Sequence, residues 1–246
     1  MAPSAVVAPS AAVAPSAVVE PGAVVMAGAE VGPGCVVGAN SVVGAGVSVG
    51  AHTVLGHGVS LSHCTVGAGC RLHSGVCVGA DGFGFFVDER TGEVRKKPQE
   101  RAVRIGDNVE IGANSCVDRG SWRDTVVGSN TKIDNLVQIG HNAVVGDGCF
   151  LCGHTALGGS SELGENVVLG GRAAVADHVK VAPGSRLAAK TGVAKTIATP
   201  GDYAGWPAVP AAEWRRGVAQ ARRDLKKRRA SLARGQSSSK SAEKGA

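Results

Sequence analysis

Aromatic residues make up only 3% of this 246-residue chain, which is too few for the large core of a layered globular domain. Long apolar runs are missing too, because Gly, Pro or a charged residue interrupts every stretch of about 18 residues, the length that a membrane-spanning helix needs. The first residues lack the basic region and apolar stretch of a secretory signal, and they lack the Arg-rich pattern of an organellar presequence. We therefore expect a core of small side chains and no integral membrane segment.

The number of cysteines is odd, with seven residues in the chain. Most of them stand one or two positions before an aliphatic residue, where a small apolar side chain is wanted. Free, buried thiols in a reducing compartment are the expectation from this placement. Cys149 and Cys152 form a CxxC, but without a second pair this is a weak indication of a metal or redox site.

A six-residue repeat is present instead. From Val127 to Val193 an aliphatic residue occupies every sixth position. The same repeat runs from Val7 to Leu61, resumes one residue early from Val66 to Val78, and returns from Ile105 to Val117. Neither a helix nor an ordinary strand has this period, whereas a solenoid with flat sides does. Three hexads would make one triangular coil, so residues 18 apart should stack on neighbouring coils. The sequence predicts an all-β, parallel β-helix of hexapeptide repeats over residues 1–205, with roughly nine coils.

Two loop insertions interrupt the repeat, at about residues 80–103 and 118–126. The first holds three of the four phenylalanines, and its segment Arg90–Glu93 is typical of a hairpin tip. Interruptions of a solenoid often carry function. The phenylalanines either anchor the loop to the solenoid or border a binding site.

The C-terminal part differs in charge. From Ala212 to Ala246 there are 11 Lys and Arg against 3 Asp and Glu, so this part carries +8 and the rest of the chain −2. Apolar residues at helical spacing predict a basic C-terminal α-helix within residues 206–234, followed by a disordered tail at 235–246. The helix could pack its apolar row on partner helices, or bind an acidic protein, RNA or an anionic membrane.

One spacing within the most regular part of the repeat suggests chemistry. His141 follows an aliphatic position by two residues, and Gly159 stands 18 residues later, on the next coil. An imidazole beside a glycine amide can serve acyl transfer, because the ring accepts a proton from the nucleophile while the N–H binds the oxyanion. Asp134 could orient the imidazole and stabilise its cation.

Several ordered motifs resemble UDP-3-O-acylglucosamine N-acyltransferase, an enzyme family of lipid A biosynthesis. They are Asp81-Gly-Phe-Gly84, Lys97-Pro-Gln99, Asp118-Arg-Gly120, Ile133-Asp-Asn135 and Gln138-Ile-Gly-His-Asn142. The resemblance implies a left-handed parallel β-helix, a homotrimer with active sites between subunits, and no metal or other cofactor. The family transfers a 3-hydroxyacyl group from the phosphopantetheine arm of acyl carrier protein to the 2-amino group of its UDP-linked sugar.

Roles for individual residues follow from the same resemblance. It makes His141 the general base, Asp134 its acidic partner and Gly159 the oxyanion amide. Contacts to substrate are implied for His178, Asn135, Asn142, Phe83, Phe85 and Gln99. The basic tail would meet acyl carrier protein rather than nucleic acid. The family usually carries an N-terminal globular domain that helps to hold the uridine nucleotide, whereas here the repeats begin within the first few residues. The implied compartment is the bacterial cytoplasm, or an organelle such as a mitochondrion or plastid in a eukaryotic host.

Three other functions remain open to test. The related O-acyltransferase acting on UDP-N-acetylglucosamine shares the solenoid and the His–Gly spacing, but we do not expect it to carry the Asp-Gly-Phe-Gly insertion. A solenoid carbonic anhydrase needs three histidines for zinc, and the third position is missing because residue 146 is Gly and residue 183 is Pro. A non-catalytic solenoid scaffold would show no turnover with any acyl thioester.

Overall fold

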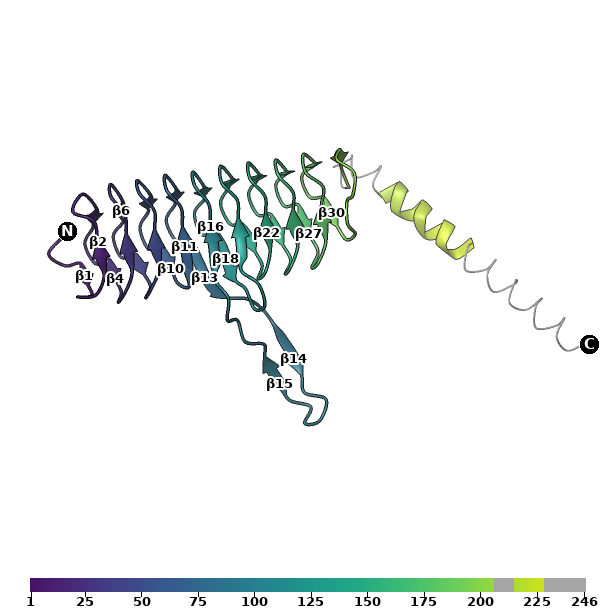
Figure 1. The fold of residues 1–246 in the computed structure, drawn as a ribbon. Coiled ribbons are helices and arrows are strands. Elements are labelled where there is room, and N and C mark those ends of the chain that lie inside the picture. The colour runs from purple at the N-terminus through teal and green to yellow at the C-terminus, as the bar shows by residue number, and fades with distance from the viewer. Residues whose placement is uncertain (206–214, 228–246) are drawn as a thin grey trace, which may run out of the picture. The chain divides into compact units, whose positions relative to one another are not determined.

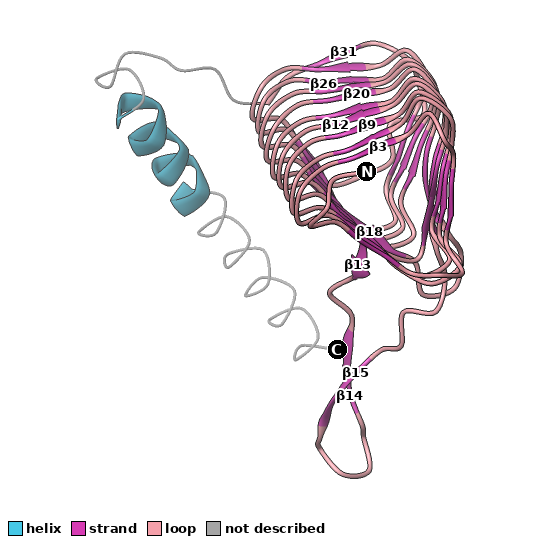
Figure 2. Ribbon diagram, turned by 90° about the vertical axis from the view of Figure 1, so that its left-hand side faces the viewer, coloured by secondary structure: helices cyan, strands magenta, loops and turns pink. Residues whose placement is uncertain are grey.

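The structure is a computed structural model that describes residues 1–205 and 215–227. Contacts divide the chain into two units, Met1–Trp206 and Pro207–Ala246. The first unit is a long solenoid of short strands with one hairpin projecting from its side (Figure 1). Viewed along its axis, three parallel sheets form the sides of a triangle (Figure 2).

Each side of the triangle is one parallel sheet, and consecutive strands of the chain belong to consecutive sides. Sheet A contains β1 (Val6–Val7), β4 (Val24–Val25), β7 (Val42–Val43), β10 (Ser60–Leu61), β13 (Cys77–Asp81), β18 (Cys116–Arg119), β21 (Gln138–Ile139), β24 (Ala156–Leu157), β27 (Ala174–Val175) and β30 (Gly192–Val193). Sheet B contains β2 (Ala12–Val13), β5 (Glu30–Val31), β8 (Ser48–Val49), β11 (Cys64–Val66), β16 (Val103–Ile105), β19 (Thr125–Val127), β22 (Val144–Val145), β25 (Glu162–Leu163) and β28 (Lys180–Val181). Sheet C contains β3 (Val18–Val19), β6 (Val36–Val37), β9 (Val54–Leu55), β12 (Arg71–Leu72), β17 (Glu110–Ile111), β20 (Lys132–Ile133), β23 (Phe150–Leu151), β26 (Val168–Leu169), β29 (Arg186–Leu187) and β31 (Asp202–Tyr203).

The aliphatic residue of each hexad is the inward residue of a strand. Ile139 is completely buried, and Leu151 and Leu157 are 1% and 2% exposed. Burying such a side chain fully stabilises the fold by about 1.5–3 kcal/mol. Residues 18 apart pair in register, as Ile139 does with Leu157. The predicted β-helix of hexapeptide repeats is confirmed, and it is slightly longer than the expected nine coils, since sheets A and C each contain ten strands.

Corners of the triangle require unusual backbone conformations. At many of them an Asn, His or Gly has a positive φ, as in Asn142 (φ 62) and His178 (φ 60). Asn tolerates this left-handed region better than most residues. The seven cysteines are free, and four of them, including Cys149, are buried beside the aliphatic row, as the sequence predicted.

Both predicted insertions leave the solenoid between sheets A and B. The first forms a two-stranded antiparallel hairpin, β14 (Phe85–Val87) and β15 (Val94–Lys96), with the turn at the expected place. Despite the insertion, β11 pairs with β16 in continuous register. The second insertion connects β18 to β19 and stays close to the solenoid.

In the second unit, a helix covers residues 215–227. The remainder of the predicted 206–234 helix and the predicted disordered tail at 235–246 lie outside the described residues. No helix in the described ranges is long and apolar enough to cross a membrane.

Candidate active site

The corner that follows sheet A is the place where two of the three predicted catalytic residues, His141 and Gly159, meet. Five successive coils contribute to it, through the residues after β13, β18, β21, β24 and β27. A cavity of about 550 Å³ lies here. It is lined by Asp81, Gly82, Phe83, Phe85, Lys96, Asp118, Gln138, Gly140, His141, Leu157, Gly158, Gly159 and Asp177.

The His141 ring is held between two glycines. A Cβ added to Gly159 would stand 2.6 Å from Cε1 and 2.7 Å from Nε2 of the imidazole. On another side, a Cβ added to Gly82 would stand 2.6 Å from the His141 Cβ. The predicted stacking of His141 and Gly159 is therefore present, and both positions need the absence of a side chain. Gly82, which belongs to the first insertion, also lines the cavity.

Asn142 sets the protonation of the imidazole nitrogens. Its Nδ2 donates to the backbone oxygen of Arg123 at 2.7 Å, so its Oδ1 faces the His141 Nδ1, 2.8 Å away. A carbonyl oxygen only accepts, so Nδ1 must carry the proton, and Nε2 keeps the lone pair that a general base needs. Asn142 is 0% exposed. In this structure the Asn142 side chain orients the histidine, and its contact with substrate stays a prediction.

The Gly159 amide is already occupied by a carboxylate. Its N–H donates to Oδ1 of Asp177 on the next coil, at 2.9 Å. The same arrangement recurs at other corners, where Ser129 N–H donates to Asp147 Oδ1 at 2.7 Å. An N–H that binds a carboxylate oxygen is suited to bind an oxyanion, but Asp177 has to move before a substrate can use it.

Carboxylates dominate the electrostatics of the cavity. Burial raises the pKa of Asp118, and the negative charge of Asp81 adds to this, while a hydrogen bond from Gln138 and the nearby His141 oppose it. The Gln138 Nε2 donates to Asp118 Oδ2 at 2.9 Å. The pKa of Asp81 is lowered, mainly by its hydrogen bond to Lys96 of the hairpin. Asp118, Asp81 and Asp177 thus share the cavity with His141, and Asp118 is the one whose pKa is raised.

The mouth of the cavity is aromatic. Phe83 and Phe85 pack edge to face, with ring centroids 5.0 Å apart. Phe83 is 87% exposed and Phe85 is 51% exposed, so these rings do not serve mainly to anchor the insertion to the solenoid. Exposed apolar rings beside a polar cavity suit a ligand with both apolar and polar parts.

Other predicted site residues lie elsewhere in the chain. Asp134 and Asn135 follow β20, at the corner between sheets C and A, and they line a separate cavity of about 380 Å³. The Asp134 carboxylate accepts from the backbone N–H groups of Asn135 and Gly153, at 2.7 and 2.9 Å. Within one chain, then, the partner of the His141 Nδ1 is Asn142 and not Asp134, because the two residues stand at different corners of the triangle.

Gln99 and His178 also have local roles. Gln99 is 5% exposed, and its Nε2 donates to the backbone oxygen of Lys97 at 3.0 Å, at the base of the hairpin. His178 is an exposed corner residue whose backbone N–H donates to the oxygen of Gly159 at 3.0 Å. Within residues 1–205 neither side chain lines the cavity of His141.

Sequence reasoning missed several residues of the site. Asp177 stands 18 residues after Gly159, so the stacking rule that joined His141 to Gly159 could have found it. Asp118 belongs to the Asp118-Arg-Gly120 motif and Lys96 to the first insertion, but neither has a spacing that connects it to the histidine. Among the described residues, no three His, Cys, Asp or Glu side chains are grouped so that they could hold a metal ion.

Comparison with known proteins agrees with the repeat. The bacterial transferase hexapeptide family (six repeats) matches residues 124–159. The hexapeptide repeat of succinyl-transferase matches residues 28–63 and 102–135.

Two curated relatives share the N-acyltransferase name. One, from Arabidopsis thaliana, is described as probable UDP-3-O-acylglucosamine N-acyltransferase 2, mitochondrial; it is 53% identical over 162 residues, which is 66% of this chain and 53% of the relative. UDP-3-O-acylglucosamine N-acyltransferase of Methylococcus capsulatus is 41% identical over 156 residues, covering 63% of this chain and 44% of the relative. The chain thus spans about half the length of the curated relatives it matches.

Solved structures with a similar fold are UDP-N-acetylglucosamine acyltransferases. That of Campylobacter jejuni has a TM-score of 0.60 and 25% identity, over 75% of this chain and 68% of the other. That of Arabidopsis has a TM-score of 0.56 and 20% identity, over 82% and 70%. The likeness to these structures supports the β-helix, while the function has to be argued from the site.

Proposed function

We propose that this chain is an N-acyltransferase. It is built from the hexapeptide repeat of bacterial transferases, and over about two thirds of its length it resembles proteins named UDP-3-O-acylglucosamine N-acyltransferase. The acceptor would be the 2-amino group of UDP-3-O-acylglucosamine. The donor would be a 3-hydroxyacyl thioester on the phosphopantetheine arm of acyl carrier protein. One observation carries the proposal: the His141 imidazole lies against Gly159 in a cavity with an aromatic mouth.

The proposed reaction uses the free Nε2 of His141 as a general base. The amine attacks the thioester carbonyl, and Nε2 takes a proton from the amine nitrogen as the C–N bond forms. The tetrahedral oxyanion then collapses, the C–S bond breaks, and the imidazolium returns the proton to the leaving sulfur. The products are an amide and a free thiol, so no external acid or metal is required. A positioned base of this kind contributes about 10²–10⁴-fold to the rate.

Oxyanion stabilisation would fall to the Gly159 N–H. In this proposal the Asp177 carboxylate holds the amide in the free protein and rotates away when the thioester oxygen arrives. Replacing one anionic oxygen by another keeps the donor paired throughout the reaction. Loss of one such donor typically costs about 10²–10³-fold in rate.

Asp134 would contribute from a neighbouring subunit. We propose a homotrimer in which the corner that carries Asp134 on one subunit faces the corner that carries His141 on the next. Such a heterologous contact closes into a ring of three identical interfaces. Asp134, placed on its own chain away from His141, could then act on the imidazole of the other chain.

The related O-acyl transfer is the second candidate, because the similar solved structures carry the name of UDP-N-acetylglucosamine acyltransferase. Two N-acyltransferase relatives at 53% and 41% identity favour the amine as acceptor. The nucleophile therefore distinguishes the two functions: the first forms an amide and the second an ester.

The decisive experiment combines purified protein with 3-hydroxyacyl carrier proteins and UDP-3-O-acylglucosamine, followed by mass spectrometry. We expect an amide product, and its loss in His141→Ala with the circular dichroism spectrum retained. A parallel reaction with UDP-N-acetylglucosamine tests for the ester. An ester as the sole product would favour the O-acyltransferase, and no product with either acceptor would favour a scaffold.

Donor docking and compartment are further parts of the proposal. The helix at 215–227 carries six Lys and Arg against one Asp, and such a surface would attract an acidic carrier protein by electrostatic steering.

The name of the Arabidopsis relative includes mitochondrial, so we propose an organelle for this chain and would test it by imaging a fluorescent fusion of the full-length protein.

A further inference from the structure

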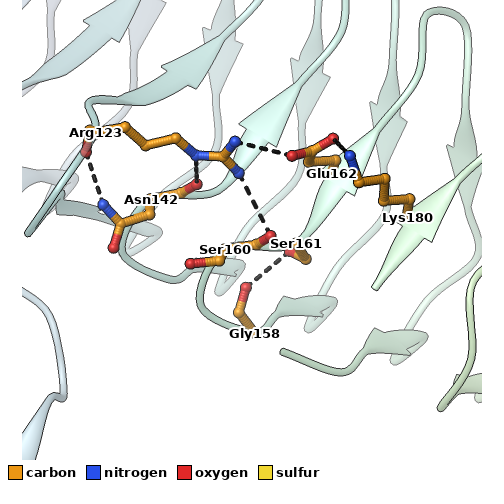
Figure 3. Close-up of polar contacts among 7 residues, drawn as sticks. All are labelled: Arg123, Asn142, Gly158, Ser160, Ser161, Glu162 and Lys180. Atoms are coloured by element: carbon orange, nitrogen blue, oxygen red, sulfur yellow. Dashed lines mark hydrogen bonds and ion pairs between the residues drawn. The ribbon is translucent and has the colours of Figure 1, made fainter. Parts of the chain in front are cut away.

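Arg123 and Asn142 hold each other's backbone. The Arg123 Nε donates to the Asn142 backbone oxygen at 2.9 Å, and the Asn142 Nδ2 donates to the Arg123 backbone oxygen at 2.7 Å. Figure 3 shows the two side chains extended along each other in opposite directions. The loop that presents Arg123 turns tightly, because a Cβ added to Gly120 would stand 1.7 Å from the Arg123 oxygen. The second insertion is thus fastened to the corner of His141 by a reciprocal pair of bonds.

The far end of the Arg123 side chain is anchored on the following coils (Figure 3). Its Nη1 pairs with Glu162 Oε1 at 2.8 Å, and its Nη2 approaches the Ser160 backbone oxygen at 3.5 Å. The other carboxylate oxygen of Glu162 pairs with Lys180 Nζ at 2.8 Å. Arg123 and Glu162 are 27% and 29% exposed, whereas Lys180 is 63% exposed. A partly buried guanidinium with three partners has little freedom to change its direction.

This arrangement decides which way the Asn142 amide faces. Because the Arg123 oxygen takes the Nδ2 donor, the Oδ1 is left to accept from Ser121 Oγ at 2.9 Å and from His141 Nδ1 at 2.8 Å. A reversed amide would place a donor against the Ser121 hydroxyl and the histidine, and an acceptor against a carbonyl oxygen. The Asn142 and Arg123 carbonyl oxygens would repel each other, and the Ser121 hydroxyl would lose its acceptor.

We propose that Arg123 is a positioning residue that fixes the tautomer and ring orientation of His141 through Asn142. Arg123 holds the Asn142 backbone with its side chain and the Asn142 amide with its own carbonyl oxygen. The amide in turn keeps the proton on Nδ1 of His141, which leaves Nε2 unprotonated beside Gly159. The significance of this tautomer for turnover rests on the proposed acyl transfer, but the tautomer itself does not depend on that proposal.

The test uses the full chain labelled with ¹⁵N-histidine, in three variants. Arg123→Gln removes the reach to Glu162, Arg123→Lys keeps the charge but loses the planar fork, and Lys180→Met breaks only the outer ion pair of Glu162. Nitrogen chemical shifts of His141 report which ring nitrogen carries the proton. We expect Nδ1–H in the wild type and in Lys180→Met, a mixture of both tautomers in Arg123→Gln, and an intermediate result in Arg123→Lys.

Kinetics provide the second readout. In Arg123→Gln we expect kcat to fall by about 10–100-fold with little change in KM, since a small displacement of a catalytic group can cost about 10²-fold. An unchanged tautomer in Arg123→Gln would overturn the proposal, even if the melting temperature fell, because Arg123 would then be a structural residue only. If the wild type shows no acyl transfer, the proposed function fails, while the nitrogen shifts still decide the role of Arg123. Should Arg123→Gln not fold, Glu162→Ala removes the anchor of the guanidinium, and a wild-type tautomer in that variant would overturn the proposal in the same way.

Discussion

Replacing Gly159 by Ala tests the contact on which the proposed chemistry depends. The new Cβ would stand 2.6 Å from Cε1 and 2.7 Å from Nε2 of His141, whereas carbon atoms in contact prefer about 3.5–4.0 Å. The ring therefore has to move by about 1 Å, and a misplacement of that size can lower kcat by about 10²-fold. Gly82 closes another side of the ring, so part of the strain remains and destabilises the fold by about 1–3 kcal/mol.

The matched control is Gly171→Ala. Gly171 occupies the same position in its hexad as Gly159, but its added Cβ would meet only the Gly153 oxygen, at 3.5 Å, which is ordinary contact. We expect this variant to change stability by less than about 0.5 kcal/mol and to retain kcat. Both variants would be assayed for amide formation, for thermal unfolding and for the ¹⁵N shifts of His141. A Gly159→Ala protein with wild-type kcat and unshifted His141 signals would refute the stacking of ring on glycine.

Three further predictions concern the carboxylates around the site. Because the pKa of Asp118 is raised in the folded protein, its ionised carboxylate destabilises the fold at neutral pH. Asp118→Asn should therefore raise the melting temperature at pH 7. Thermal scans should show that this gain vanishes as the pH falls below the unfolded pKa of about 3.9. Asp177→Ala frees the Gly159 N–H and should lower the KM for the acyl donor in steady-state assays, and a raised KM would mean that Asp177 itself contacts substrate. Co-expressed Asp134→Ala and His141→Ala chains should regain about a quarter of the wild-type activity, since each interface of a random trimer has one chance in four of combining an intact Asp134 with an intact His141. If the mixture stays inactive, Asp134 does not act across the interface.

The repeat could be predicted from sequence because one rule governs every coil. An inward residue such as Ile139 or Leu151 must be aliphatic, since it packs against its equivalents on the coils before and after it. The same rule placed Gly159 beneath His141. The same stacking rule places Asp134 and His141 at different corners, because a separation of seven residues spans a whole side of the triangle and ends at the next corner. A pairing of these two side chains within one chain would therefore conflict with the stacking rule that predicted the fold, and the role of Asp134 stays a prediction.

Contacts made by the insertions could not be predicted in this way. Gly82, Lys96 and Arg123 lie in segments without periodicity, so nothing in their spacing indicates which coil they reach. The hairpin itself was predictable from its turn residues, and it is present. Its direction was not, because that depends on where the chain leaves β13 and on the left-handed Gly79 (φ 88), at which the register between β13 and β18 shifts.

A repeating solenoid has many equivalent corners, so a departure from the repeat must distinguish the corner that forms the candidate active site. Here the two insertions leave the same corner, on the two coils that precede His141. The hairpin segment contributes Gly82 and the aromatic mouth, and the second loop contributes Arg123, which binds the Asn142 backbone. The strand after the hairpin, β16, pairs with β11 in continuous register, and the register shift at Gly79 lies in β13, before the hairpin begins. Changes in the length or composition of the hairpin can therefore alter which ligands enter without disturbing the stacked residues that perform the chemistry. Changes in the second loop cannot be tolerated in the same way, because Asn142 and the histidine depend on its backbone.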